Sequence, residues 1–388
     1  MNEYVPECIS IPIVNDVHSV LRQASRIVVK VGSSSITASA GGINAYPLQA
    51  LSTVIAKRWA TGSQVLLVSS GAISAGMAPL GLAKRPKDLA TQQAAASAGQ
   101  GSLMAAYTQA FSLHGMSVGQ VLLTADDLHR RSHYVNASRT LERLLELEVV
   151  PVVNENDAVA TDEIRFGDND RLAALVANLV DADALILLSD VDALYDGHPR
   201  APGASRIPMV HRPEQIAHVD TGAMTSTVGT GGMISKVSAA AMANQEGITV
   251  LLTSTENAGA ALDGEDVGTY FAPTGPKKSA RRRWLAHAAS VRGRLILDRG
   301  AVDAVVQRQR SLLPVGVTRI EGHFGVGDTV DLCDPAGHVV ARGLVNYTSG
   351  ELAPLVGTRL NNDQIDHARP RANNAGRSVV RRDDLVVL

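Results

Sequence analysis

Short apolar runs alternate with longer segments of helical spacing through the first two thirds of this 388-residue chain. Residues 184–188 and 247–252 are apolar at nearly every position, and residues 26–31 and 64–69 are similar runs. Strands that are apolar at successive positions, rather than at alternate ones, are typical of parallel sheets buried on both faces. The pattern predicts an α/β fold, a doubly wound sandwich with a mainly parallel sheet.

The composition changes after about residue 272, which indicates a second domain. Residues 273–290 are rich in Pro, Gly, Lys and Arg and are predicted to be a linker. Short β-type runs separated by glycines follow, so residues 291–388 are predicted to form a small β-rich domain. Residues 25–272 would then form the α/β domain, and residues 1–24, which show no clear period, an extension before the fold.

The bulk composition argues against several classes of protein. A net charge of −2 and an aromatic content of 3% do not favour a dominant nucleic-acid surface. Cys8 and Cys333 are the only cysteines and lie far apart in sequence, so neither a disulfide framework nor a zinc site is predicted. No apolar run is long enough for a membrane span, and the N-terminus lacks a signal-peptide pattern. We therefore expect a cytoplasmic enzyme.

An acidic stretch, residues 151–170, follows the apolar run 149–153. It carries a single cation, Arg165, together with Glu155, Asp157, Asp162, Glu163, Asp168 and Asp170, and with the interleaved Asn154, Asn156 and Asn169. Like charges this close destabilise a fold unless a cation neutralises them. The stretch is either a solvated acidic loop or a pocket for an ammonium group, a metal ion or both.

Cationic and small residues lie at the ends of other predicted strands, where open α/β sheets bind ligands. Lys30 precedes a Gly/Ser run, residues 32–35, and Lys236 lies in the first helical turns after the glycine-rich residues 229–232. Such loops let backbone N–H groups approach a phosphate. The alternative for Lys30 is a side chain that extends from the strand end into solvent.

Two lysines, a glycine-rich loop and acids at one sheet edge favour phosphoryl transfer, in which positioning and charge neutralisation do most of the work. The chain has neither a GxxxxGK[ST] loop nor a GxGxxG fingerprint, which disfavours the commonest nucleotide-binding folds. No histidine lies at these strand ends. Because a carboxylate is already ionised at pH 7 and needs no base, this absence favours a carboxylate acceptor and an acyl-phosphate product.

Several motifs together resemble the amino-acid kinase family, in particular the glutamate 5-kinases with a C-terminal PUA domain. The motifs are VVKVGSSSIT, VSSGAISAG, SVGQVLLT, PVVNENDAVATDEIRFGDND, LLSDVDALY and GTGGMISK, with RRRWL, LDRGA, SLLPVGV and RRDDLVV further on. The resemblance covers roughly residues 26–388. It implies a three-layer α/β sandwich of the amino-acid kinase type and a small β-rich PUA-like domain.

The resemblance also implies an activity. The enzyme would transfer the γ-phosphoryl group of ATP to the side-chain carboxylate of L-glutamate, giving glutamyl 5-phosphate in the first step of proline biosynthesis. Mg²⁺ bridging the ATP phosphates is implied as well. Further expectations from the family are inhibition by proline and a homo-oligomer, either a dimer or a tetramer, with no membrane or nucleic-acid partner.

Roles of individual residues follow from the matched motifs. Lys30 and Lys236 match lysines that neutralise the transferring phosphoryl group, and Asp190 matches an acid that holds lysines in place. The expected nucleotide-binding residues are Lys30, Ser189, Asp190, Thr230, Gly231, Gly232, Met233, Ile234, Ser235 and Lys236. The expected glutamate-binding residues are Ser70, Asn154, Asp157, Asp168, Asn169 and Asp170. No protein ligand of a metal ion is expected.

Three alternative interpretations also agree with the sequence. Asp168 and Asp170 could instead be acids that stabilise a helix N-terminus before Arg171. The substrate could be another carboxylate or a carbamate, as in related kinases. The PUA-like domain could bind RNA, and a salt-sensitive affinity would then be expected.

Overall fold

The computed structural model describes residues 17–37, 42–159, 169–197, 199, 201, 203–216, 232–274, 285, 291–356 and 378–388. The chain forms two compact units. The first comprises residues 1–122, 143–177 and 182–276, and the second residues 123–142, 178–181 and 277–388. None of the described helices is long and apolar enough to span a membrane.

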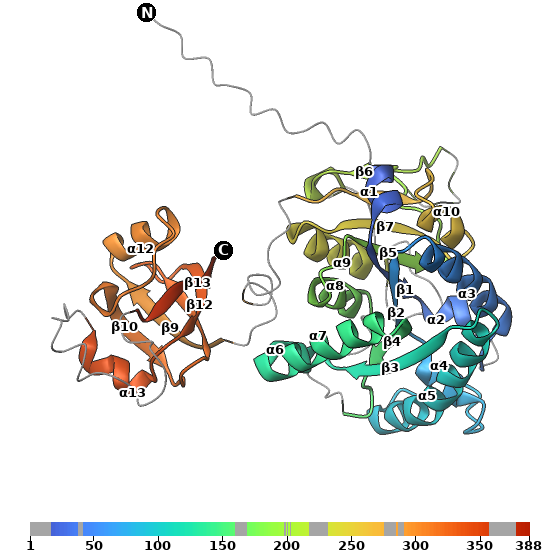
Figure 1. The fold of residues 1–388 in the computed structure, drawn as a ribbon, viewed down its shortest axis with the longest axis horizontal. Coiled ribbons are helices and arrows are strands. Elements are labelled where there is room, and N and C mark those ends of the chain that lie inside the picture. The colour runs from blue at the N-terminus through green and yellow to red at the C-terminus, as the bar shows by residue number, and fades with distance from the viewer. Residues whose placement is uncertain are drawn as a thin grey trace, which may run out of the picture. The chain divides into compact units, whose positions relative to one another are not determined.

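An eight-stranded sheet forms the centre of the first unit (Figure 1). Its strands are β1 (Arg26–Val31), β2 (Gln64–Ser69), β3 (Ser117–Leu123), β4 (Val149–Glu155), β5 (Ala184–Ser189), β6 (Met209–Val210), β7 (Thr249–Ser254) and β8 (Thr269–Phe271). They lie in the order β3-β4-β2-β1-β5-β7-β8-β6. The pairs β4–β2, β2–β1, β1–β5 and β5–β7 are parallel, whereas β8 is antiparallel to β7. The predicted mainly parallel α/β sheet is confirmed.

The apolar strands are central because both their faces are covered. Every residue of β5 and β7 is buried, as expected for strands without polar alternation. The helices and 3-10 turn of this part of the chain are α1 (Val17–Gln23), α2 (Ser33–Ile36), α3 (Ala45–Ala60), α4 (Ala72–Met77), α5 (Leu89–Ser112), α6 (Ala125–His129), α7 (Arg131–Glu146), α8 (Asn169–Leu179), η1 (Pro213–Ile216), α9 (Met233–Gln245) and α10 (Ala258–Leu262).

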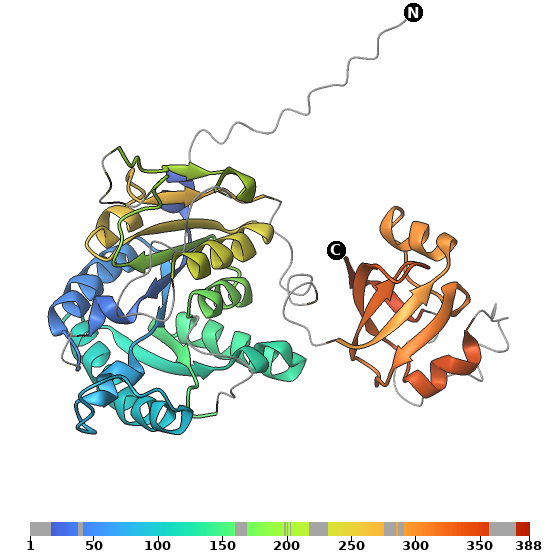
Figure 2. The ribbon, with the colours of Figure 1, turned by 180° about the vertical axis from the view of Figure 1, so that it is seen from behind.

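The two faces of the sheet carry different helices. One core cluster joins apolar residues of α1, α3, α5 and α10 to residues of β1 such as Val29 and Val31. Side chains alternate along a strand, so Lys30 points to the opposite face. Figures 1 and 2 show α8 and α9 next to each other on that face. Lys30 is therefore directed toward the layer that contains α8 and α9.

The segment for which we expected an N-terminal extension contains a packed helix. In α1, Val17 and Leu21 are buried in the core cluster with the sheet. Arg58 of α3 donates hydrogen bonds to the carbonyl oxygens of Leu21, Arg22 and Ala24 at the end of α1. A guanidinium here satisfies carbonyl groups that a helix C-terminus leaves without partners. Residues 1–16 lie outside the described residues.

A second, five-stranded sheet with the order β10-β9-β11-β12-β13 lies in the C-terminal part of the chain. Its strands are β9 (Val291–Leu297), β10 (Val317–Gly322), β11 (Thr329–Cys333), β12 (Val339–Val345) and β13 (Val380–Val387). Beside them lie α12 (Arg299–Val306), η3 (Pro314–Gly316), α13 (Ser349–Leu352) and η4 (Ala353–Leu355). A separate core cluster, which includes Leu295, Val330 and Tyr347, holds these elements together. The predicted β-rich C-terminal part is confirmed.

Candidate active site

Two lysines and one aspartate from three different elements meet at the carboxyl end of the parallel sheet. Lys30 lies near the end of β1, Asp170 lies in the first turn of α8, and Lys236 lies in the first turn of α9. Asp170 Oδ1 is 2.7 Å from Lys30 Nζ, and Asp170 Oδ2 is 3.4 Å from Lys236 Nζ. The three residues are only 5%, 1% and 6% exposed, respectively. The alternative of a solvent-exposed Lys30 is therefore wrong.

The charges of this Lys30–Asp170–Lys236 cluster do not cancel. Burial alone would raise the pKa of Asp170, but the adjacent Lys30 and Lys236 lower it below its ordinary value, so the carboxylate is ionised. The pKa of Lys236 is lowered by burial and by repulsion from Lys30, although Asp170 opposes the shift. Two ammonium groups and one carboxylate leave a net positive charge, which attracts an anion such as a phosphoryl group.

Asp170, rather than Asp190, contacts both lysines. Its Oδ2 also accepts a hydrogen bond of 2.7 Å from Ser235 Oγ. Asp190 is exposed, accepts a hydrogen bond of 3.0 Å from Ser189 Oγ, and acts on Lys236 through its charge. The motifs suggested that Asp190 holds the lysines in place. In the structure Asp170, which we had expected to bind glutamate, contacts both lysines instead. Asp170 also lies in the first turn of α8, the position that the helix N-terminus alternative gave it.

Small residues after β1 and β2 keep the backbone close to this cluster. A Cβ atom at Gly32 would lie 3.8 Å from Lys30 Nζ, so the Gly/Ser run is next to the ammonium group. The Ser70 N–H donates a hydrogen bond of 3.1 Å to the Val31 carbonyl, which places Ser70 beside the end of β1. Gly71 has a positive φ of 98°, which permits the sharp turn from β2 into α4.

The expected nucleotide-binding residues lie on the β5 side of the cluster. Ser189 ends β5, and Gly232 precedes α9, whose first residues are Met233, Ile234, Ser235 and Lys236. Met233 is buried and Ile234 is exposed. Thr255, just after β7, links β5 to the segment after β1. Its backbone N–H donates a hydrogen bond of 3.2 Å to the Ser189 carbonyl, and its hydroxyl donates one of 2.7 Å to Ser35 Oγ.

The expected glutamate-binding residues of β4 lie on the other side, two strands from Lys30. Asn154 is 1% exposed and donates a hydrogen bond of 2.8 Å from Nδ2 to Gln100 Oε1 of α5. Its Oδ1 accepts a hydrogen bond of 2.9 Å from the Glu155 N–H. Asn169 is buried next to Asp170, and its Oδ1 has no hydrogen-bond partner among the described residues.

Asp157 is a carboxylate whose environment does not stabilise its charge. Burial, together with the nearby Glu155, raises the pKa of Asp157 to about 7, although Arg85 opposes the shift. Burial lowers the pKa of Arg85, and Asp157 opposes this in turn. Arg85 thus acts on Asp157 through its charge. A cationic ligand beside Asp157 would stabilise its charged form.

Three of the expected site residues are not among those that the structure describes. Asp168, Thr230 and Gly231 lie outside the described residues, as do Asp162 and Glu163 of the acidic stretch. Of the remaining expected residues, the structure brings Lys30, Lys236 and Asp170 into one cluster, with Ser235 in contact. Ser70 and Gly232–Ser235 flank that cluster, and Asn154 and Asp157 lie across β2 from it.

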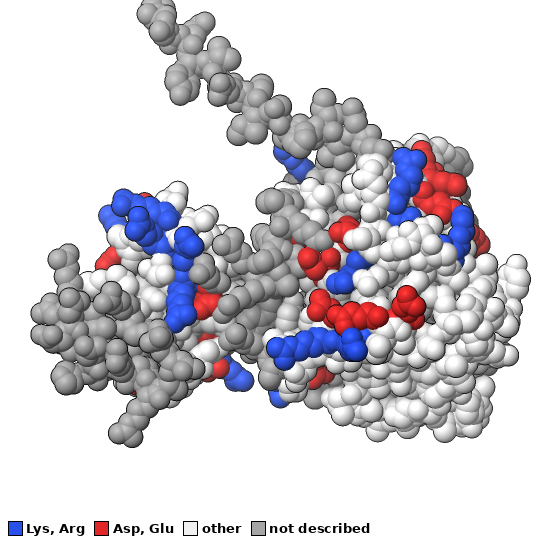
Figure 3. All heavy atoms as spheres, viewed as in Figure 1, with Lys and Arg blue, Asp and Glu red and all other residues white. Residues whose placement is uncertain are grey.

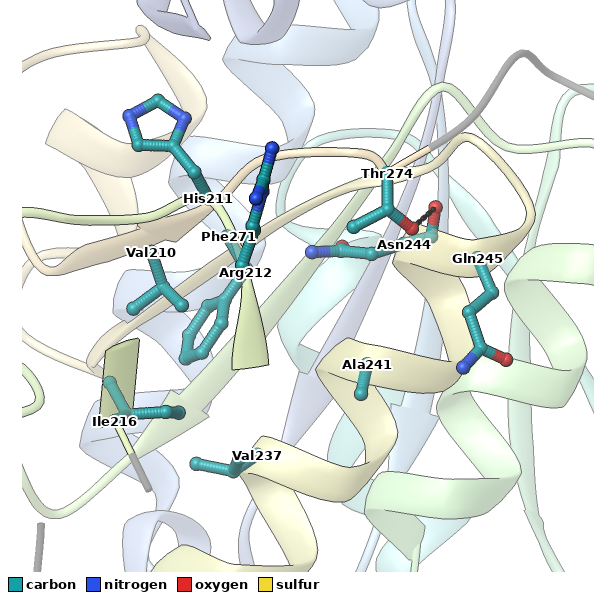
Figure 4. Close-up of a pocket in the computed structure, with 10 residues that line it drawn as sticks. All are labelled: Val210, His211, Arg212, Ile216, Val237, Ala241, Asn244, Gln245, Phe271 and Thr274. Atoms are coloured by element: carbon teal, nitrogen blue, oxygen red, sulfur yellow. Dashed lines mark hydrogen bonds between the residues drawn. The ribbon is translucent and has the colours of Figure 1, made fainter. Parts of the chain in front are cut away.

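A cavity of about 180 Å³ flanks α9 but is separate from this cluster (Figure 4). Its described lining residues include none of the expected site residues: they are Val210, His211, Arg212, Ile216, Val237, Ala241, Asn244, Gln245, Phe271 and Thr274. Phe271 pairs with Val250 near the start of β7, so the cavity extends toward the amino end of that strand, away from Lys236.

On the face drawn in Figure 3, acidic and basic side chains of the first unit lie beside each other rather than in one basic patch.

Comparison with known proteins decides the family. The amino acid kinase family model matches residues 25–254, and the PUA domain model matches residues 293–362. Glutamate 5-kinase of Streptomyces avermitilis is 57% identical over 368 residues, which cover 94% of this chain and 97% of that protein. The chain belongs to the glutamate 5-kinases of the amino acid kinase family. Glutamate 5-kinase of Thermobifida fusca is 55% identical over 372 residues, 95% of this chain and 94% of that protein.

The glutamate 5-kinase family and the amino-acid kinase fold that the motifs implied are thus confirmed. Among solved structures, Giardia carbamate kinase aligns with 64% of this chain and 99% of its own chain, at 17% identity and a TM-score of 0.47.

Sequence reasoning missed two polar residues of this glutamate 5-kinase site, Gln100 and Arg85. Both precede the acidic stretch by more than fifty residues, and neither carries a motif. Gln100 is found through its contact with Asn154, and Arg85 through its electrostatic interaction with Asp157. Such long-range contacts depend on how α5 and the segment before it pack on the sheet, and no local pattern predicts them.

Proposed function

We propose that this chain catalyses ATP-dependent phosphorylation of the side-chain carboxylate of L-glutamate, giving glutamyl 5-phosphate. The observation that carries the proposal is the pair of buried ammonium groups, Lys30 and Lys236, held by one carboxylate at the edge where open α/β sheets bind ligands. The names of the relatives at 55–57% identity supply the substrate.

Glutamate carries one ammonium and two carboxylate groups, and the proposed site offers a partner for each. We assign the ammonium group to Asp157, for which Arg85 is the cation that acts on its charged form within the described ranges. The strands β4 and β1 are separated by β2, so groups at their ends are about 10 Å apart. A glutamate held at β4 by its Cα groups can extend its side-chain carboxylate past Ser70 toward Lys30.

In the proposed reaction an oxygen of the side-chain carboxylate attacks the γ-phosphorus of ATP. A new bond forms between this oxygen and phosphorus, the bond to the ADP oxygen breaks, and ADP leaves. No proton has to be removed, since the carboxylate is ionised at neutral pH. Lys30 and Lys236 stabilise the negative charge on the phosphoryl oxygens, and Asp170 fixes the positions of both ammonium groups.

The nucleotide is assigned to the β5 and α9 side, with Ser189, Asp190 and residues 230–236 as its proposed contacts. Mg²⁺ is part of the proposal: bound with ATP, it would supply positive charge next to the phosphates, and it would take most of its ligands from phosphates and water. No group of three or more His, Cys, Asp or Glu side chains in the described ranges is arranged to hold a metal ion.

Further elements of the proposal rest on the sequence and on the family rather than on the geometry of the site. We propose a catalytic domain at residues 25–272, a linker at 273–290 and a PUA-like domain at 291–388. We also propose a cytoplasmic homo-oligomer that proline inhibits in competition with glutamate. A proline titration at several glutamate concentrations tests the last point, and an unchanged rate at every concentration would contradict it.

The assay that tests the substrate traps an acyl phosphate with hydroxylamine. We expect ATP-dependent hydroxamate with L-glutamate and at most traces with aspartate, N-acetylglutamate or carbamate. If hydroxamate forms preferentially from one of the other three acceptors, that acceptor rather than glutamate is the substrate. The assignment of the phosphoryl-transfer site would be unaffected.

A further inference from the structure

Gln100 of α5 is a polar residue at the glutamate side of the site to which neither the sequence motifs nor the proposed reaction gives a role. We infer that Gln100, together with Asn154, binds the α-carboxylate of glutamate through its side-chain N–H groups. The inference rests on the proposed function, since it concerns how that substrate is held. Its basis is the hydrogen-bond arrangement around Asn154.

The orientation of both amides follows from one backbone contact. The Glu155 N–H can only donate, so the Asn154 side-chain atom 2.9 Å from it must be the oxygen, Oδ1. The Asn154 nitrogen Nδ2 therefore points to Gln100, and the Gln100 atom that accepts at 2.8 Å must be its oxygen, Oε1. Gln100 Nε2 is consequently the end of this amide that faces away from Asn154.

That nitrogen is buried and has no hydrogen-bond partner among the described residues. A buried N–H without a partner is unfavourable, so such groups are expected to meet water or a ligand. Asn154 has a second N–H that its bond to Gln100 does not use. The two amides thus present neighbouring donors, and a carboxylate with several acceptor positions suits neighbouring donors.

The packing of α5 against α4 fixes Gln100 at this place. A Cβ atom on Gly99 would collide with the Ala72 carbonyl, and one on Gly76 would collide with the Ala95 carbonyl. The two helices therefore touch through their backbones at the residue that precedes Gln100. Since α4 follows Ser70 directly, this crossing puts Gln100 near the ends of both β2 and β4.

The strand order identifies which carboxylate Gln100 would contact. The carboxylate that accepts the phosphoryl group has to reach Lys30 and Lys236 at β1 and α9, whereas Asn154 and Gln100 lie at β4. Asp157, the proposed partner of the ammonium group, follows the same strand three residues after Asn154. The α-carboxylate shares its carbon with the ammonium group, so it is the carboxylate that lies beside Asp157.

The test compares Gln100→Leu, Gln100→Glu and the control Gln109→Leu, which changes an exposed residue of the same helix. Gln100→Leu removes the donor and the acceptor. Gln100→Glu keeps an oxygen for Asn154 but replaces the donor by an anionic oxygen that repels a carboxylate. We expect the KM for glutamate to rise at least about tenfold in Gln100→Leu and further in Gln100→Glu. The kcat and the KM for ATP should stay within about twofold of the parent.

Three results would overturn the inference. An unchanged KM for glutamate in Gln100→Leu would mean that Gln100 has no role in binding glutamate. A Gln100→Glu variant equal to the parent would mean that Gln100 only positions Asn154. Equal loss in Gln109→Leu would point to a general effect on α5.

If Gln100→Leu does not fold, as judged by thermal unfolding, the isosteric Gln100→Glu carries the test. Failure of the parent enzyme to phosphorylate glutamate would contradict the proposed function and is seen separately, before any variant is compared.

Discussion

Individual charged residues decide the chemistry of this site, because three of them are buried where water cannot screen them. Asp170 contacts both Lys30 and Lys236, so the positions of the two ammonium groups depend on this carboxylate. Charges fixed in a buried site stabilise a developing anion more strongly than charges in water. The lysines are therefore expected to act on the transition state rather than on the binding of glutamate.

Replacing Lys236 by alanine tests this expectation. We predict that kcat falls about 100-fold or more, while the KM for glutamate changes by less than about threefold. Lys57→Ala, which removes an exposed lysine paired with Asp263, is the matched control and should leave both constants unchanged. Steady-state kinetics with purified variants provide the measurement. A variant with normal kcat and a raised KM for glutamate would mean that Lys236 binds the acceptor rather than the phosphoryl group.

Asp157 gives the site a pH dependence with a definite sign. Its pKa is raised to about 7, so the carboxyl group of the free enzyme is protonated below that value and cannot pair with an ammonium group. We predict that kcat/KM for glutamate increases as pH rises through about 7. In Asp157→Asn, this step should be absent and kcat/KM low at every pH. The profile is measured at saturating ATP, and a parent enzyme without the step would contradict the assignment.

Helices and strands determine which of these residues meet, and part of this arrangement follows from the sequence. The apolar runs predicted the parallel strands, and the residues after them predicted the strand ends that carry Lys30, Ser70 and Asn154. Two features did not follow from the sequence. The contact of Asp170 with both lysines depends on how α8 and α9 pack, and Gln100 reaches Asn154 only because α5 crosses α4 at two glycines.

This helix crossing makes a prediction about stability. Gly99→Ala places a methyl group against the Ala72 carbonyl and should lower the free energy of unfolding by about 1–3 kcal/mol. Gly101→Ala, two residues further along α5, meets no atom within 4 Å and should raise the free energy of unfolding by up to about 1 kcal/mol. Chemical denaturation of the two variants measures both changes. Equal changes in the free energy of unfolding of the two variants would mean that the backbones of α4 and α5 are not in contact at Gly99.

At the scale of the whole molecule, each of the two units has its own sheet and its own core. Separate cores often unfold in separate transitions. We predict at least two transitions in a calorimetric scan of the full chain. Ligands that bind only the folded form of one unit stabilise only that unit. Glutamate with a non-hydrolysable ATP analogue should therefore raise the transition of the first unit alone, and an equal shift of all transitions would contradict this.

An isotope experiment tests whether the phosphoryl group is transferred to the side-chain carboxylate of glutamate. Glutamate labelled with ¹⁸O in the side-chain carboxylate is incubated with ATP, the enzyme and hydroxylamine, and the released phosphate is analysed by mass spectrometry. Attack by a carboxylate oxygen leaves that oxygen between carbon and phosphorus, and hydroxylamine then displaces it with the phosphate. We predict released phosphate that carries one ¹⁸O atom, and much less of this phosphate with the Lys236→Ala variant. Phosphate without the label would mean that water, rather than glutamate, accepts the phosphoryl group.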